Sequence, residues 1–270
     1  MGGSIPGGTG ESMKAKFYWQ KRRDDARPFD LPRRISEGIN ACRKSAQGAR
    51  GETAAIRYIW IHLTHDGLHH GPRPESAPAA LTLDDWLNII DESAALGAQW
   101  MVIYVGASLS QTPVVWELCQ WAQQTHGLNV GLHLRCDCLT GDDVERVSGL
   151  DPKLTYLVAD GECMSALNTL QERGLHVCKS DLHLRETFTR CTKPVDMACV
   201  GADGHLFSCG LVLGESEFAL GNVRERLLGE VIADTNLPHV IDNATRYPTR
   251  GCEGCPPYIA EQVEQLRDGH

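Results

Sequence analysis

Apolar and polar residues follow two different periods along the middle of the chain. Runs rich in β-branched and aromatic residues predict strands at 56–63, 100–105, 130–134, 154–159 and 176–179. Between these runs, apolar residues recur at helical spacing and predict helices at 82–96, 113–125, 142–147 and 164–173. The first of these helices has Thr82 as its expected N-cap and ends before Gly97.

Strands that alternate with helices predict a parallel sheet with right-handed crossover connections. Five strands are too few to close an eight-stranded barrel. The predicted fold class is therefore α/β, an open, partial βα barrel of parallel strands, followed by a small Cys-rich β-hairpin and a helix. In parallel α/β folds the chemistry lies at the carboxyl ends of the strands.

Composition divides the chain into three expected parts. Residues 1–50 are predicted to be a flexible, basic leader that includes a helix at 35–49. Its basic and aromatic stretch at 14–34 either contacts a partner or packs its aromatic rings on the barrel, and the second interpretation is favoured. The barrel is expected at 51–187 and the Cys-rich part at 188–270.

Cysteines dominate the candidate chemistry of the last part. Cys191 and Cys209 flank Asp203-Gly204, which predicts a two-residue hairpin turn and would make the two thiols face each other across a ribbon. Cys252 and Cys255 form a C-x-x-C pair between a glycine and two prolines, on a segment predicted to be a non-helical loop. Four thiolates from two loops suit a tetrahedral zinc or an iron–sulfur cluster.

Core packing is the competing interpretation of these thiols, because cysteine is among the most buried residue types. The C-x-x-C pair, flanked by glycine and proline, is a poor core pattern, which favours a metal site. Cys199 lies in the middle of a predicted strand beside Val200, and we expect it to be packed.

The same region resembles the C-terminal auxiliary-cluster domain of radical SAM enzymes. The matching residues are the run C-x(12)-G-x(4)-C over Cys191, Gly204 and Cys209, then the stretch from Leu220 to Glu225 with Gly-Asn-Val, then the late C-x-x-C. With one C-x-x-C, the pattern is similar to the shortened twitch form of the SPASM domain. The resemblance covers about residues 188–260. It implies one 4Fe–4S cluster, with Cys191, Cys209, Cys252 and Cys255 as its ligands.

The resemblance also implies a cofactor motif that this chain lacks. Radical SAM enzymes hold their first cluster with C-x-x-x-C-x-x-C after the first strand, and the three cysteine positions here are Gly67, Gly71 and Pro74. At the end of the second strand, where the family has Gly-Gly-Glu-Pro, Gly106 remains and the acid is replaced by Ala107. Gly106 is thus the candidate cofactor-binding residue, and reductive cleavage of S-adenosylmethionine is not expected.

The loop after the first strand offers a different ligand set. His65, Asp66, His69 and His70 supply imidazoles and a carboxylate, enough for a catalytic metal with an open position. A polar loop at the rim of a cleft is the plainer interpretation and the favoured one. Weaker candidates follow later strands: Cys136 and Cys138 are predicted to be buried, Asp160 and Glu162 to be helix caps, and Asp181 and His183 are open to acid–base roles.

Composition narrows the class of protein. The 270 residues have a formal net charge of −9, which argues against a nucleic-acid-binding surface. No run of about 18 apolar residues occurs, and the start lacks a signal-peptide core, so neither a membrane contact nor export is expected. The 11 cysteines of an unexported chain indicate a reducing compartment, and the expected location is the cytoplasm.

Three hypotheses for function follow. The first is a radical SAM-like protein with one auxiliary cluster and no SAM cleavage, which binds a peptide, a small substrate or a true radical SAM enzyme during peptide or cofactor maturation. The second is an enzyme that uses the His and Asp loop with a new metal. The third is an interaction module that the four cysteines hold together with structural zinc.

Overall fold

A computed structural model describes residues 56–64, 80–106, 109–135, 139–160, 164–179, 196–214, 216–234, 237 and 254–268. Every statement below concerns these residues. None of their helices is both long and apolar enough to cross a lipid bilayer.

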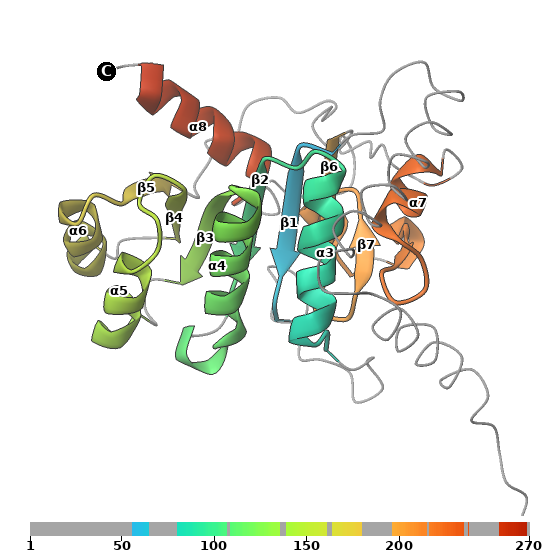
Figure 1. Ribbon diagram of the computed structural model, residues 1–270, viewed down its shortest axis with the longest axis horizontal. Coiled ribbons are helices and arrows are strands. Elements are labelled where there is room, and N and C mark those ends of the chain that lie inside the picture. Colours follow the sequence, from blue (N-terminus) through green and yellow to red (C-terminus); the bar gives the residue numbers. More distant parts are fainter. Residues whose placement is uncertain are drawn as a thin grey trace, which may run out of the picture.

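One open sheet of eight strands organises the molecule (Figure 1). The spatial order is β5-β4-β3-β2-β1-β6-β7-β8, and all neighbours from β5 to β6 are parallel. The first five strands are β1 (Tyr58–His62), β2 (Trp100–Tyr104), β3 (Asn129–Arg135), β4 (Thr155–Asp160) and β5 (His176–Lys179). The last three are β6 (Met197–Val200), β7 (His205–Phe207) and β8 (Gly221–Asn222). The α/β fold class and the open, partial barrel are confirmed.

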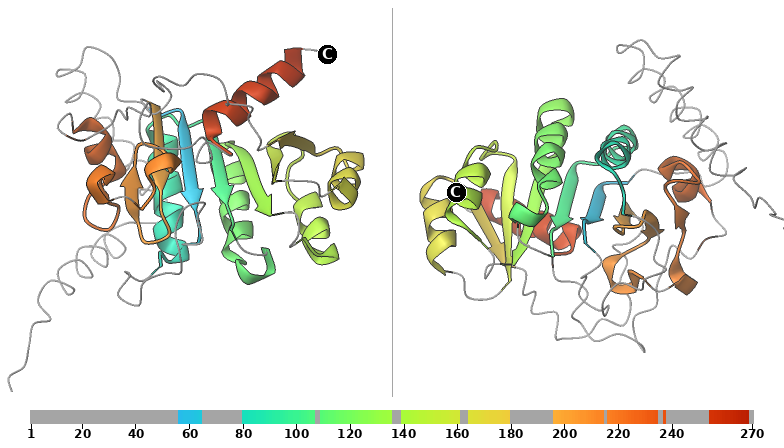
Figure 2. Two further views of the ribbon diagram at one scale, coloured as in Figure 1. Left: turned by 180° about the vertical axis from the view of Figure 1, so that it is seen from behind. Right: turned by 90° about the horizontal axis from the view of Figure 1, so that it is seen from below.

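Crossover helices cover the outer face of this sheet (Figures 1 and 2). They are α3 (Leu83–Ala95), α4 (Val114–His126), α5 (Gly141–Ser148) and α6 (Met164–Glu172), with the short turn η1 (Leu109–Gln111) before α4. Thr82 caps α3 through a capping box with Asp85, as the sequence predicts, and Thr140 caps α5 with Asp143 in the same way. Each predicted strand and helix of the barrel is present within one or two residues of its expected ends.

The strands pack two different cores because successive side chains point to opposite faces. The outer core joins aliphatic strand residues to the crossover helices, with Ile59, Ile61, Met101, Ile103 and Leu132 among its members. The inner core is richer in aromatic residues and thiols, and it contains Tyr58, Trp60, Trp100, Tyr156, Cys178 and Cys199. The sheet is open, so no opposite strands cover its inner face, and another element must do so.

Helix α8 (Pro256–Asp268) covers the inner face instead, on the side of the sheet opposite α3 and α4 (Figure 2). Its apolar residues Ile259, Ala260 and Val263 belong to the inner core. Near its end, Glu264 accepts a hydrogen bond of 3.0 Å from Arg57, and Arg267 donates to the hydroxyl of Tyr156. The end of α8 therefore lies near the starts of β1 and β4, and the beginning of α8 lies deeper in the barrel.

The remaining elements extend the sheet beyond β1. Two short 3-10 turns, η4 (Gly210–Val212) and η5 (Ser216–Phe218), connect β7 to β8, and α7 (Leu228–Ala233) follows β8. Parallel pairing of β6 with β1 makes this part continuous with the barrel in one sheet. The boundary expected between residues 187 and 188 falls outside the described residues.

We expect Ile259→Ala to lower the free energy of unfolding by about 2–5 kcal/mol, because it leaves a cavity where a fully buried side chain fills the inner core. Urea unfolding followed by tryptophan fluorescence measures the change. Gln265→Ala, at an exposed position of the same helix, is the control and should stay within about 0.5 kcal/mol of wild type. Equal losses in the two variants would contradict the burial of α8 on the inner face.

Candidate metal centre

The hairpin of β6 and β7 is closed by three residues, not two. Gly201 N–H donates to His205 O at 2.9 Å, and Gly204 N–H donates to Gly201 O at 2.9 Å. Gly204 has a φ of 87°. A turn of three residues that ends in a left-handed glycine is a common hairpin connection. The predicted two-residue turn is wrong, because Ala202 also belongs to the loop.

Asn222 holds this turn in place from the neighbouring strand. Its side-chain N–H donates to Asp203 O at 3.2 Å, and its Oδ1 would lie 2.9 Å from a Cβ added at Gly204. Val223 N–H donates to Gly204 O at 2.9 Å. The glycine of the C-x(12)-G-x(4)-C run and the Gly-Asn-Val stretch are therefore in contact. Both motifs serve to hold the hairpin turn.

Cys209 and Cys199 lie close together on the inner face. Both belong to the inner core, and burial raises the pKa of the Cys199 thiol, with a further increase from the nearby Cys209. A thiol kept protonated is a poor metal ligand. Cys199 is fully buried in the middle of β6, so the prediction that it is packed is confirmed.

Pairing between β6 and β7 joins Val200 to Leu206 and Cys199 to Phe207, so Cys209 follows the paired part of β7. That Cys191 and Cys209 face each other across the ribbon stays a prediction. Cys191 lies outside the described residues, and its role as a ligand stays a prediction.

Cys255 directly precedes α8 and is itself outside the helix, as the predicted non-helical segment requires. Tyr258 N–H and Ile259 N–H donate to Cys255 O at 3.0 and 3.1 Å, so Cys255 caps the helix. Pro256 occupies the first helical position, where a missing N–H costs nothing and a fixed φ favours the helix. The buried Cys255 side chain thus sits at the positive end of the helix dipole, which stabilises a thiolate.

Gly254 brings the C-x-x-C loop into contact with β3. It has a φ of 71°, and an added Cβ would lie 2.2 Å from His133 Nδ1. His133 is fully buried on β3, so Gly254 lies against the barrel interior. Cys252, the other member of the pair, is outside the described residues.

A row of aromatic side chains surrounds this contact, and sequence patterns did not reveal it. Ring centroids are 5.1 Å apart for Trp60 and His62, 5.2 Å for His62 and Tyr104, and 4.9 Å for Tyr104 and His133. The two imidazoles stand two strands apart, about 9–10 Å at the usual strand spacing, too far to bind one ion together. In the sequence, this row is indicated only by His62 and His133, which alternate with the outward residues of two predicted strands and so fall on the inner face.

Two buried side-chain donors, one on β1 and one directly after β7, lack an acceptor among the described residues. Trp60 Nε1 and Ser208 Oγ are buried and have no hydrogen-bond partner within the described part of the chain. A buried donor without a partner costs about 1–3 kcal/mol, and the sulfur atoms of a zinc or iron–sulfur site accept hydrogen bonds. No group of three or more His, Cys, Asp or Glu side chains placed for a metal occurs among the described residues, but two of the four predicted ligands are not among them.

Backbone conformation and a close contact explain why position 106 is a glycine. Its φ is 70°, and an added Cβ would lie 2.1 Å from Thr64 Oγ1, which donates to Val105 O at 3.2 Å. Because Gly106 has no Cβ, the side chain of Thr64 packs directly against its backbone at the end of β2. A cofactor-binding role for Gly106 therefore stays a prediction.

Several other candidates lie outside the described residues. They are the three positions of the missing cluster motif, the four loop ligands and the later polar residues, namely Gly67, Gly71, Pro74, His65, Asp66, His69, His70, Cys136, Cys138, Glu162, Asp181 and His183. Asp160 is the last residue of β4.

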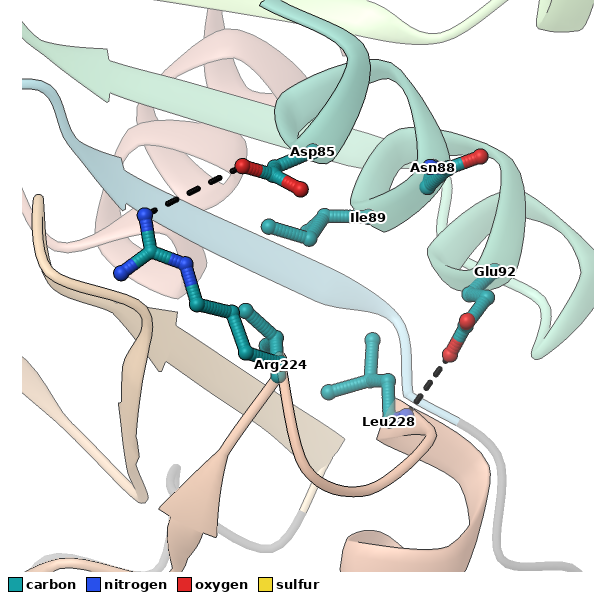
Figure 3. A pocket seen from close by; sticks show the side chains of 7 residues that line it. Asp85, Asn88, Ile89, Glu92, Arg224 and Leu228 are labelled. Carbon is teal, nitrogen blue, oxygen red and sulfur yellow. Dashed lines mark hydrogen bonds and ion pairs between the residues drawn. The ribbon is translucent and has the colours of Figure 1, made fainter. Parts of the chain in front are cut away.

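A pocket on the outer side lies between α3 and the segment after β8 (Figure 3). Its lining consists of Asp85, Asn88, Ile89, Glu92, Val223, Arg224 and Leu228. Arg224 lies 3.9 Å from Asp85, and Leu228 N–H donates to Glu92 at 2.7 Å. These contacts attach the segment before α7 to α3. The pocket contains none of the predicted ligands, and the two that the structure describes, Cys209 and Cys255, belong to the inner core.

Comparison with known proteins gives only distant matches. No family model and no curated protein match the chain. Among solved structures, SuiB of Streptococcus suis bound to S-adenosylmethionine is 10% identical, with a TM-score of 0.46, and the match covers 72% of this chain and 69% of that one. SuiB bound to precursor peptide SuiA is 11% identical, with a TM-score of 0.45 and coverage of 72% and 68%. Likeness at this level carries no inference about function.

We expect Gly254→Ala to destabilise the protein more than Gly127→Ala does. Both glycines have positive φ, near 71° and 65°, but only the Gly254 Cβ would meet another side chain, since nothing lies within 4 Å of Gly127. Left-handed backbone alone costs about 1–2 kcal/mol for alanine, and displacement of His133 adds to it. Chemical denaturation of both variants measures the difference, and equal costs would mean that the C-x-x-C loop does not press on β3.

Proposed function

We propose that this chain is a metalloprotein on a radical SAM-like partial barrel, with one 4Fe–4S cluster held by Cys191, Cys209, Cys252 and Cys255. The observation that carries the proposal is the placement of Cys209 and Cys255 in one buried core on the inner face, although one follows the hairpin and the other begins α8. Sequence spacing predicts that these thiols share a ligand set, but it does not predict that they belong to the inner core.

The surroundings of the two thiols support a metal rather than core packing. Packing thiols need only apolar neighbours, whereas this core also contains the indole N–H of Trp60 without an acceptor in the described residues. Cys255 lies at a helix N-terminus, which favours a thiolate. Such a cluster would supply electron transfer or an anchor for substrate, and the residues of this chain would enclose it and exclude water.

We further propose that the protein acts as an accessory or substrate-binding partner in peptide or cofactor maturation, not as an enzyme that cleaves S-adenosylmethionine. Two sequence changes support this role, the loss of the three cysteines after β1 and of the acid after Gly106. The approach to the Gly106 backbone is occupied by Thr64. In this proposal residues 51–187 supply the scaffold and 188–270 supply the cluster ligands.

Metal analysis tests the proposed centre. We expect protein purified without oxygen to contain iron and sulfide, and Cys209→Ser and Cys255→Ser each to lose at least half of the bound iron. Cys119→Ala, a buried thiol of the outer core on α4, is the control and should keep the wild-type content. Zinc in place of iron would favour the structural-zinc hypothesis, and metal that persists in both serine variants would point to the His and Asp loop.

A second measurement tests the absence of SAM cleavage. We expect the protein, loaded with iron and sulfide and reduced with dithionite, to form no 5′-deoxyadenosine from S-adenosylmethionine, because no cysteine remains at positions 67, 71 and 74. Chromatography of the reaction mixture measures the product. Formation of 5′-deoxyadenosine above the level of a metal-free sample would contradict the accessory role.

A further inference from the structure

The entry to α3 lies at the carboxyl edge of the sheet, where the connection from β1 returns to the barrel. Leu81 N–H donates to Ala202 O, in the hairpin turn, at 2.8 Å. Arg224 Nη2 donates to Ala80 O at 2.9 Å. Within the described part of the chain, both hydrogen bonds of residues 80 and 81 therefore lead to segments that follow β6.

Leu81 adds an apolar contact with the same turn. Its side chain is 8% exposed, and its Cδ2 would lie 3.1 Å from a Cβ added at Gly204. Thr82, the N-cap of α3, donates through its N–H and its hydroxyl to one carboxylate oxygen of Asp85, at 2.9 and 2.8 Å. Arg224 lies 3.9 Å from the same oxygen (Figure 3). One guanidinium thus reaches the carbonyl before the cap and the carboxylate that completes the cap.

Asn222 connects this guanidinium to the hairpin turn. Its Oδ1 accepts from Arg224 N–H at 3.0 Å, and its side-chain N–H donates to Asp203 O at 3.2 Å. The turn, Asn222, Arg224 and the entry to α3 thus form one continuous series of hydrogen bonds, as coupling between distant segments requires. At the other end of the connection between β1 and α3, Thr64 donates to Val105 O. The two ends of this connection are held by different parts of the chain.

We propose that the hairpin turn and Arg224 form a clasp on residues 80–82, through which the C-terminal part of the chain positions the first βα connection. In parallel α/β folds the chemistry lies in the connections at the carboxyl ends of the strands. A shift of the hairpin turn would therefore move the entry to α3 at the edge where such chemistry takes place. Arg224 is the positioning residue of this clasp, and its contacts need no metal.

Hydrogen exchange of the Leu81 amide on the full chain, detected by NMR, measures opening of the clasp, because this N–H makes one of its bonds. Arg224→Ala removes the guanidinium, and Arg224→Lys keeps the charge without the fork. Arg226→Ala is the matched control. The Arg226 side chain is 38% exposed against 34% for Arg224, and its ion pair with Asp234 stays within the segment after β8. The Met101 amide, inside the buried strand β2, reports global unfolding.

We expect Arg224→Ala to raise the exchange rate of the Leu81 amide about tenfold, which equals about 1.4 kcal/mol of local stability. Arg224→Lys should restore part of the protection. The Met101 amide should change less than twofold in both variants, and Arg226→Ala should change neither amide by more than twofold.

A second variant tests the series of hydrogen bonds rather than the single contact. Asn222→Ala alters no bond of residues 80 and 81, yet it should also speed exchange of the Leu81 amide, because Asn222 holds both Arg224 and the turn. The double variant with Arg224→Ala should show less than the product of the two single increases, since both changes break one network.

The outcomes are distinct. Exchange of the Leu81 amide that is unchanged in Arg224→Ala overturns the clasp. Equal acceleration of the Leu81 and Met101 amides also overturns it, because Arg224 would then stabilise the whole fold. Independent effects of Arg224→Ala and Asn222→Ala overturn the coupling through Asn222. Iron and zinc contents decide the proposed function separately, and neither result changes these expectations.

Discussion

The packing of α8 against the inner face of the sheet is the interaction on which the rest of the structure depends. An open barrel leaves aromatic side chains such as Trp100 and Tyr156 on its concave side, and a sheet face of this kind must be covered to be stable. Helix α8 covers it with Ile259 and Val263 and is held at its far end by Arg57 and Tyr156. The helix therefore has one orientation, which places Cys255 inside the barrel and Gly254 on His133.

The hairpin of β6 and β7 extends the sheet on the side of β1 opposite β2. Parallel pairing of β6 with β1 extends the sheet, and the antiparallel return through β7 brings Cys209 back to the inner core. Asn222 and Gly204 fix the turn, so the position of Cys209 depends on contacts made at the opposite end of the hairpin. Two segments that are distant in sequence thus contribute thiols to one core.

Much of the barrel could be predicted from local patterns. The apolar run at 56–63 and the capped helix after Thr82 each show a clear period of apolar residues within a short stretch of sequence. Such local periods predict secondary structure without knowledge of tertiary contacts. The three-residue turn was missed because Asp203-Gly204 fits two hairpin geometries, and only the hydrogen bond between Gly201 and His205 distinguishes them. The helix expected in the last part of the chain begins at Pro256, and a proline at the first helical position favours a helix start.

The candidate site was less predictable because its parts meet only through tertiary contacts. Nothing local to Gly254 indicates His133, and nothing local to Trp60 indicates Gly210. The spacing of the cysteines predicted a shared ligand set, but not that Cys209 and Cys255 would belong to the inner core. Which residues meet on the inner face depends on which helix covers it. That choice depends on packing against all strands of the sheet together.

The order of elements along the chain has a consequence for biosynthesis. Strand β1 (Tyr58–His62) pairs with β6 (Met197–Val200), and its inner face is covered by α8 (Pro256–Asp268), so both contacts wait until much later parts of the chain have left the ribosome. Until then the nascent chain carries a half-built sheet with Trp60, Trp100 and Tyr156 open to solvent, a state that attracts chaperones and favours aggregation. Packing of α8 covers these side chains only after the strands and the crossover helices have been made.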